Sequence, residues 1–228
     1  MKRLFAFVMI GMICLTACGS NVEAELSADS NAETEVTADS EEAAELPVYY
    51  GGGTWDRMLP ESYSDLVDHS DAVVIAEPAA EKEQFVDKSY DANLGRMLAS
   101  SGYTVVSYKV DQVIMGDVKE GDTLDIREYH YNWVWYEEDG STTDCIICRS
   151  NAKPSVIGEK YLLYLTKRQI DETWDFTFGE YGIYTYDDKT VGPWVREDMD
   201  QESREYTLYQ AIFREVAAQM TESGDTNS

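Results

Sequence analysis

The stretch "GYTVVSYKVDQVIMGD", residues 102–117, is the one that decides the fold. Two sets of side chains alternate along it: Tyr103, Val105, Ser107, Lys109 and Asp111 on one side, and Thr104, Val106, Tyr108 and Val110 on the other. This period of two, together with the β-branched residues, predicts one long β-strand.

Further strand patterns lie on both sides of this stretch. The apolar run 71–78 reads as a strand that stops at Pro78. Another strand begins after the Gly-Asp turn at 121–122, and Asp139-Gly140 marks the tip of a hairpin from which residues 141–150 return. Three more strand candidates follow, at 158–168, 173–188 and 191–195.

Two helices are predicted at the ends of this series. Ser62 and Asp65 form a capping-box pattern before a short helix. Near the C-terminus, an apolar stripe of period 3.6 predicts an amphipathic helix that packs on the sheet: Tyr206, Leu208, Tyr209, Ile212, Phe213, Val216, Ala217 and Met220. Because no βαβ alternation occurs, we expect a mainly β fold with added helices (α+β), a small antiparallel barrel in one domain over residues 47–220. A disordered polar tail is expected at 221–228.

Three phrases in this order carry a family resemblance: "SDLVDHSDAVVIAEP", "YTVVSYKVDQVIMGDVKEGDTLDI" and "GEKYLLYLTK". The pattern, over about residues 62–186, resembles that of the netrin-like domains and tissue inhibitors of metalloproteinases, and of uncharacterised bacterial lipoproteins that share it. The resemblance implies an OB-type five-stranded β-barrel. Those inhibitors coordinate zinc through a free N-terminal cysteine. Here that cysteine would be Cys18, lipidated and far from the domain, so the resemblance implies a fold and not the inhibitory function.

The N-terminus predicts export and lipidation. Lys2 and Arg3 precede an apolar run of about a dozen residues, which is too short to span a bilayer and is typical of a secretory signal peptide. Leu15-Thr16-Ala17-Cys18 then resembles the lipobox of bacterial lipoproteins. We therefore expect a signal peptide at 1–17 and a lipid on Cys18 that holds the protein on the extracytoplasmic side of a bacterial membrane. The alternative is an ordinary signal peptide with a chance cysteine.

A strongly acidic segment follows the lipobox. Residues 18–46 contain nine Asp and Glu, no Lys or Arg and no aromatic residue, which predicts a disordered linker. The whole chain has a formal net charge of −26. Such a charge repels nucleic acid, so a nucleic-acid-binding function is excluded. We expect a monomer whose charge serves solubility.

The sequence offers no convincing catalytic centre, metal site or cofactor site. The only histidines are His69 and His130, and neither has a nucleophile motif around it. Carboxylates are too numerous for a hydrolytic pair to be identified from the sequence. The stretch 137–144 offers Glu138, Asp139, Ser141 and Asp144 around a turn, but without the spacing of a calcium-binding EF-hand loop.

The strand "EYHYNWVWY" is the candidate binding surface. By period two, Tyr129, Tyr131, Trp133 and Trp135 share one face. The functional interpretation is an aromatic platform for a glycan or a partner protein. The alternative is that one face belongs to the core and the other shields a loop or helix.

Cys145 and Cys148 form a C-x-x-C pair in "TTDCIICRSN". Zinc binding would need about four ligands, and a thioredoxin-type dithiol would need a βαβ frame. A local disulfide is the preferred interpretation, and it would require a bulge or turn at Ile146-Ile147.

Together these features predict a membrane-anchored surface lipoprotein with a non-enzymatic binding domain, whose partner is an envelope or surface protein or a glycan. The alternative is an envelope enzyme, either a C-x-x-C thiol oxidoreductase or a carboxylate-dependent hydrolase.

Overall fold

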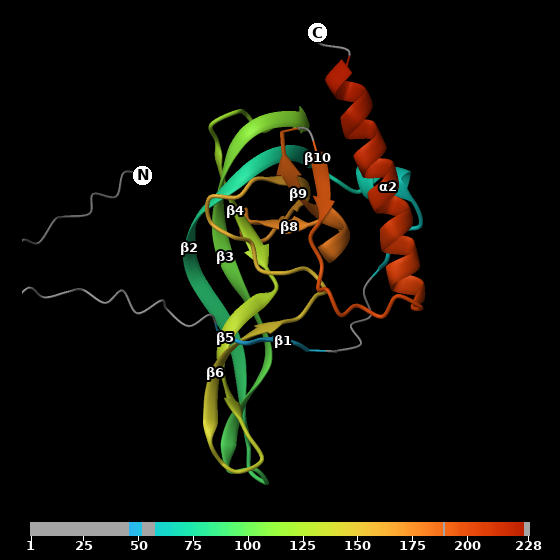
Figure 1. Cartoon of the computed structure of the whole chain (residues 1–228). Helices are drawn as coiled ribbons and strands as arrows, with labels where there is room; N and C mark the ends of the chain where they lie inside the picture. Colours follow the sequence, from blue (N-terminus) through green and yellow to red (C-terminus); the bar gives the residue numbers. More distant parts are fainter. Residues whose placement is uncertain (1–45, 52–57, 189, 226–228) are drawn as a thin grey trace, which may run out of the picture. The chain divides into compact units, whose positions relative to one another are not determined.

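The computed structural model describes residues 46–51, 58–188 and 190–225 (Figure 1). The predicted signal peptide, the lipidation site Cys18 and nearly all of the predicted linker lie outside the described residues. The described part is mainly β with two α-helices and one short 3-10 helix, which confirms the predicted fold class. Its elements are β1 Val48–Tyr50, α1 Tyr63–Asp68, β2 Ala72–Asp91, β3 Arg96–Met115, β4 Thr123–Glu128, β5 His130–Tyr136, β6 Thr142–Cys148, β7 Tyr161–Lys167, β8 Trp174–Phe176, η1 Gly179–Gly182, β9 Ile183–Asp187, β10 Thr190–Pro193 and α2 Arg204–Asp225.

Seven strands form one sheet in the order β10-β9-β7-β2-β3-β4-β8, and the other three form a second sheet in the order β1-β6-β5. Because β7 also pairs with β8, the pairings β2-β3-β4-β8-β7 return to β2. The five strands do not lie evenly around an axis, so they form a ring of pairings rather than a regular closed barrel. Two pairs, β4–β8 and β1–β6, are parallel, and for these the prediction of antiparallel pairing is wrong.

The ring is stable because its central strands are buried on both faces. Alternate residues of β2 and β7, such as Val74 and Leu163, belong to a cluster inside the ring. Their neighbours Val73 and Leu162 belong to a second cluster that also includes residues of α1 and α2. Strands buried on both faces have continuous apolar sequences, which explains the runs at 72–76 and 161–165.

The predicted end of the strand at Pro78 is wrong, because β2 continues through it to Asp91. Pairing of β2 with β7 ends at Ala76, and the β2–β3 register shifts between Pro78 and Ala80. A proline, which has no backbone N–H, is tolerated at such a bulge beyond the paired edge. The predicted strand at 102–117 is confirmed as far as Met115, where β3 ends, and β3 also begins earlier, at Arg96.

Both predicted helices are present. Ser62 caps α1 by accepting a hydrogen bond from the backbone N–H of Asp65 (3.2 Å). The predicted apolar stripe of α2 buries Tyr209, Ile212 and Val216 against the second cluster. The helix runs to Asp225, so the prediction of a disordered tail from residue 221 is wrong for its first five residues.

The described part carries its own hydrophobic core. All three clusters of buried residues draw their members from residues 59–220, and residues 44–228 form one compact unit. A chain that begins at Ala44 should therefore fold by itself.

Candidate functional site: the aromatic arm

Two hairpins extend beyond the ring, at the bottom of Figure 1. The first is the outer part of β2–β3, residues 84–103, and the second is β5–β6, residues 130–148. We call these two hairpins, together with β1, the arm. In the first turn the Asp91 carboxylate accepts hydrogen bonds from the backbone N–H groups of Asn93 (2.8 Å) and Leu94 (3.1 Å). In the second turn Gly140 has a φ of 85°, a conformation that favours glycine.

The two hairpins are held together by polar and apolar contacts. The Gln84 side-chain amide binds both backbone groups of Asn132: it donates to the carbonyl (3.2 Å) and accepts from the N–H (2.7 Å). Between the hairpins, Tyr131, Cys145 and Ile147 form a small buried cluster. A side chain at Gly102 would collide with the Tyr131 ring, because an added Cβ would lie 2.5 Å from Cδ1. The arm thus has its own small interior.

The four predicted aromatic residues do not form one surface. Tyr129 lies between β4 and β5, and its hydroxyl donates to Asp175 (3.2 Å). Tyr131 is only 2% exposed, and Trp133 packs against the same small cluster. Trp135 is 44% exposed and stacks on Tyr49, with ring centroids 5.2 Å apart. The predicted face is wrong as a single platform because the β2–β3 hairpin, which the sequence did not reveal, covers its inner part.

The arm nevertheless carries most of the exposed large apolar side chains. Of the fifteen in the described residues, six lie elsewhere: Leu46, Met58, Ile114, Val156, Ile157 and Ile170. The other nine lie on the arm: Val48, Tyr49, Phe85, Tyr90, Leu94, Met97, Val134, Trp135 and Tyr136. The four from the β2–β3 hairpin could not be predicted, because that hairpin lacks a regular apolar alternation.

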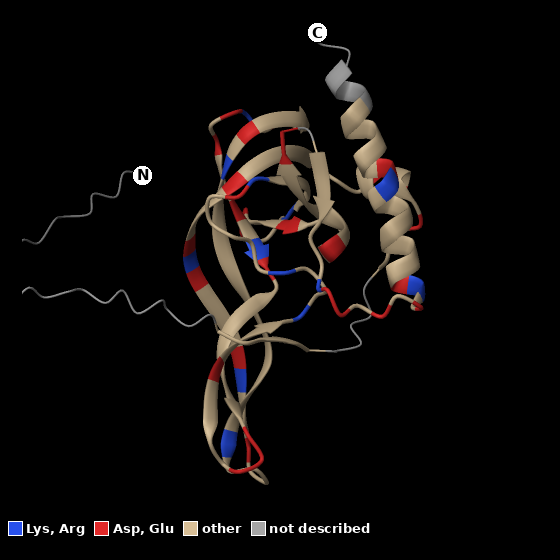
Figure 2. Cartoon of the chain, viewed as in Figure 1, with Lys and Arg blue, Asp and Glu red and all other residues tan. Residues whose placement is uncertain are grey.

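The surface of the arm is acidic as well as apolar, and Figure 2 shows acidic residues at its tip. It has six acidic residues, Asp87, Asp91, Glu137, Glu138, Asp139 and Asp144, and two basic residues, Lys88 and Arg96. Both cations lie over aromatic rings, Lys88 over Trp133 at 5.5 Å and Arg96 over Tyr136 at 4.5 Å. The carboxylates at the tip therefore dominate the charge that a partner would meet.

The turn within residues 137–144, whose carboxylates suggested calcium binding, is an ordinary hairpin tip. The Asp139 carboxylate accepts hydrogen bonds from the backbone N–H (2.9 Å) and the hydroxyl (2.7 Å) of Ser141, which lower the pKa of Asp139. Within the described ranges, no group of three His, Cys, Asp or Glu side chains is arranged to hold a metal ion.

Cys145 and Cys148 are both free and buried, so the predicted local disulfide is absent. Register is continuous from His130–Cys148 to Tyr136–Thr142, without the bulge that a bond would need. In such a strand, side chains three residues apart point to opposite faces. Burial raises the pKa of Cys145, and burial together with the nearby Glu128 raises that of Cys148 to about 12. Both thiols stay protonated at neutral pH, and a protonated thiol is a poor nucleophile.

A buried carboxylate at the base of the arm was not identified from the sequence. Glu128, 2% exposed, accepts hydrogen bonds from the Tyr108 hydroxyl (2.6 Å) and from the backbone N–H (2.9 Å) and hydroxyl (2.5 Å) of Ser155. His130 Nε2 lies 3.2 Å from Glu128 Oε2, the oxygen that also accepts from the Ser155 N–H. Burial opposes ionisation, but the hydrogen bonds from His130, Ser155 and Tyr108 outweigh it and lower the pKa of Glu128. Glu128 therefore links β4, β3 and the segment after β6 as an ionised group.

Among the described residues, neither histidine has the hydrogen-bond partners of a Ser-His-acid triad. Ser155 donates its hydroxyl to Glu128 and not to His130, so the Ser-to-His bond of a triad is missing there. His69 ends α1, and its Nδ1 lies 2.9 Å from the carbonyl oxygen and 3.0 Å from the carboxylate of Asp65. This is the helix-end role expected of a histidine at that position.

No helix in the described ranges is both long and apolar enough to cross a membrane. Comparisons of the chain with protein-family models, with curated proteins and with solved structures gave no match.

Proposed function

We propose that this chain is a lipid-anchored bacterial surface protein and that its domain is a non-enzymatic binding module whose contact surface is the arm. The partner is a protein or glycan of the cell surface or envelope. The concentration of exposed large apolar side chains on the arm carries this proposal, because gathered apolar patches on a soluble surface mark interaction sites.

The scaffold in this proposal is an OB-type barrel. The five-strand ring of pairings supports it, and so does its mixture of four antiparallel pairs with one parallel pair. In this arrangement the ring supplies stability, and the arm supplies contact surface without contributing to the main core.

The anchor in this proposal is a diacylglyceryl lipid on Cys18, and the acidic linker holds the domain away from the membrane. Two acyl chains are enough for durable anchoring. Metabolic labelling of the full chain with a palmitate analogue should mark the wild type and not Cys18→Ser, and the variant should leave the membrane fraction. Equal labelling of both chains would contradict lipidation at Cys18.

The contact surface can be tested with a photo-crosslinking amino acid in the full chain on living cells. We expect adducts from Tyr90 and Trp135, on the arm, and none from Ile170, which is 87% exposed but lies off the arm. A glycan partner would instead appear as array binding that is lost in Trp135→Ala. Adducts from Ile170 alone, or unchanged glycan binding by a folded Trp135→Ala chain, would contradict the arm as the binding surface.

A further inference from the structure

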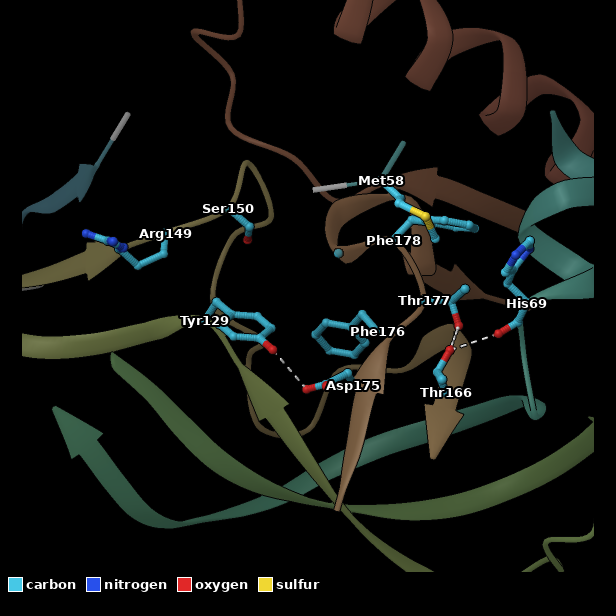
Figure 3. A pocket seen from close by; sticks show the side chains of 11 residues that line it. Met58, His69, Tyr129, Arg149, Ser150, Thr166, Asp175, Phe176, Thr177 and Phe178 are labelled. Atoms are coloured by element: carbon cyan, nitrogen blue, oxygen red, sulfur yellow. Dashed lines mark hydrogen bonds between the residues drawn. The ribbon is translucent and has the colours of Figure 1, made fainter. Parts of the chain in front are cut away.

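A cavity of about 390 Å³ lies next to the base of the arm (Figure 3). It is bounded by β7, β8, the turn that leads into η1, the end of α1 and the segments around Tyr129 and Ser150. Native proteins have few voids larger than a water molecule, and small-molecule sites occupy roughly 300–1,000 Å³. The cavity therefore has the size of a ligand site and exceeds an ordinary packing defect.

Four of the eleven residues that line the cavity carry rings: His69, Tyr129, Phe176 and Phe178. Phe176 and the ring of Tyr129 stand on one side in Figure 3, and Phe178, Met58 and the His69 ring lie across from them. Phe178 packs edge-on against His69, with ring centroids 5.1 Å apart. Aromatic rings prefer other rings as partners in such edge and offset contacts.

The Asp175 carboxylate beside the cavity is already paired with the Arg168 guanidinium. Asp175 accepts hydrogen bonds from Arg168 (2.6 Å) and from the Tyr129 hydroxyl (3.2 Å). Burial and the nearby Asp175 raise the pKa of Tyr129 to about 12, so the phenol stays neutral. The other charged residue that lines the cavity, Arg149, interacts with the Tyr131 side chain. A ligand cation would have to displace Arg168, and a ligand anion would face the Asp175 carboxylate.

The threonine hydroxyl groups in the wall are also engaged. Thr166 donates to the carbonyl oxygen of His69 (2.9 Å), and its oxygen lies 2.8 Å from the Thr177 hydroxyl. The Thr177 hydroxyl in turn lies 3.0 Å from Ser70 Oγ. Two polar groups of the lining keep hydrogen-bonding capacity. His69 Nε2 has no hydrogen-bond partner among the described residues, and Ser150 Oγ accepts from the Ala152 N–H (3.3 Å) but leaves its own donor free to bind a ligand.

The backbone at the cavity is strained. Phe178 has a φ of 56°, in the left-handed region that a bulky residue rarely adopts, and Gly179 follows with a φ of 66°. Strained residues of this kind cluster at ligand sites. The Phe178 side chain lies in the wall of the cavity.

We infer that this cavity is a binding site for a small uncharged aromatic compound with a single hydrogen-bonding group, of the phenol or indole class. The ring would lie among Phe176, Phe178 and Tyr129, and its polar group would reach His69 Nε2. This site is separate from the contact surface proposed on the arm, and neither proposal depends on the other.

The test uses residues 44–228 with ¹³C-methyl methionine and indole as the probe. We expect a saturable shift of the Met58 methyl signal, with a Kd in the ~millimolar range appropriate to a fragment of this size. Met97, an exposed methionine on the arm, should not shift and serves as the internal control. Benzoate and phenethylamine, the anionic and cationic counterparts, should bind at least about tenfold more weakly than indole.

Two variants make the test decisive. Ser150→Trp adds bulk at the cavity, and Phe178→Gly removes one ring while accepting the left-handed backbone. Each should weaken indole binding by at least about tenfold in a chain whose thermal unfolding shows that it is folded. A Met58 signal that does not shift, or charged probes that bind as well as indole, would overturn the inference. Binding that appears only in Trp55→Ala would also overturn it, because residues 52–57 of the chain would then be the occupant.

Discussion

Trp174 on the ring and Trp135 on the arm are the same residue type, each on a short strand, yet they are 8% and 44% exposed. The strands of the ring enclose one large cluster of buried side chains, and Trp174 belongs to this cluster. The arm is two hairpins with one shared interior, so every side chain that points outward from it reaches solvent. Exposure of aromatic residues is therefore set by the number of layers around a strand and not by the sequence of that strand.

A substitution at the junction between ring and arm should change the free energy of unfolding most. Glu128→Ala should lower the free energy of unfolding by about 3–5 kcal/mol, because it leaves buried hydrogen-bond donors without their carboxylate. The neighbouring Glu83→Ala, exposed on β2, should stay within about 0.5 kcal/mol of wild type. Urea denaturation of residues 44–228 measures both, and equal effects would mean that Glu128 does not link the two regions.

The same carboxylate should make stability depend on pH. The pKa of Glu128 is lowered in the folded chain relative to its ordinary value of 4.5, so its contribution is complete above pH 4.5 and is lost as pH falls through the folded-state pKa. Glu128→Gln lacks this contribution. The difference in free energy of unfolding between wild type and Glu128→Gln should therefore shrink below pH 4.5. A constant difference from pH 7 down to pH 3 would show that Glu128 is not ionised in the folded state.

Within the arm, Gly102 tests whether the two hairpins share an interior. Gly102→Ala should cost about 1–3 kcal/mol, because the added methyl group overlaps the Tyr131 ring. Gly140→Ala has open space but a positive φ, and should cost about 1 kcal/mol of backbone strain. Hydrogen exchange should rise in both hairpins for Gly102→Ala and only at the tip for Gly140→Ala. Exchange confined to β3 in Gly102→Ala would contradict a shared interior.

The two regions also differ in how far their sequences predict them. The ring was largely predictable, since "AVVIA" and "YLLYL" are buried on both faces and the 102–117 alternation is strong. The outer part of the β2–β3 hairpin was not, because residues 81–91 are mostly exposed and carry no apolar period. Missing it led to one error: Tyr131 and Trp133 were placed on an open platform. The disulfide prediction failed for another reason, because the β5–β6 register has no bulge at Ile146-Ile147. The hydrogen bonds of Glu128 could not be predicted from the sequence either, because their donor Ser155 is 27 residues away along the chain.

Apart from the control Glu83→Ala, the smallest effect on stability should come from Trp135→Ala. Its main contact is the stack on Tyr49, and such a pair contributes about 0.5–1.5 kcal/mol, so the loss should be about 1 kcal/mol or less. Trp174→Ala, the matched change on the ring, should cost about 3–5 kcal/mol, because it empties a core site. For binding the order should reverse, since a central exposed tryptophan on an interface typically contributes about 2 kcal/mol or more. Denaturation and partner binding measured on the same two variants separate these effects. If Trp135→Ala destabilised the chain as much as Trp174→Ala, Trp135 would be a core residue of the arm and would have no separate role in binding.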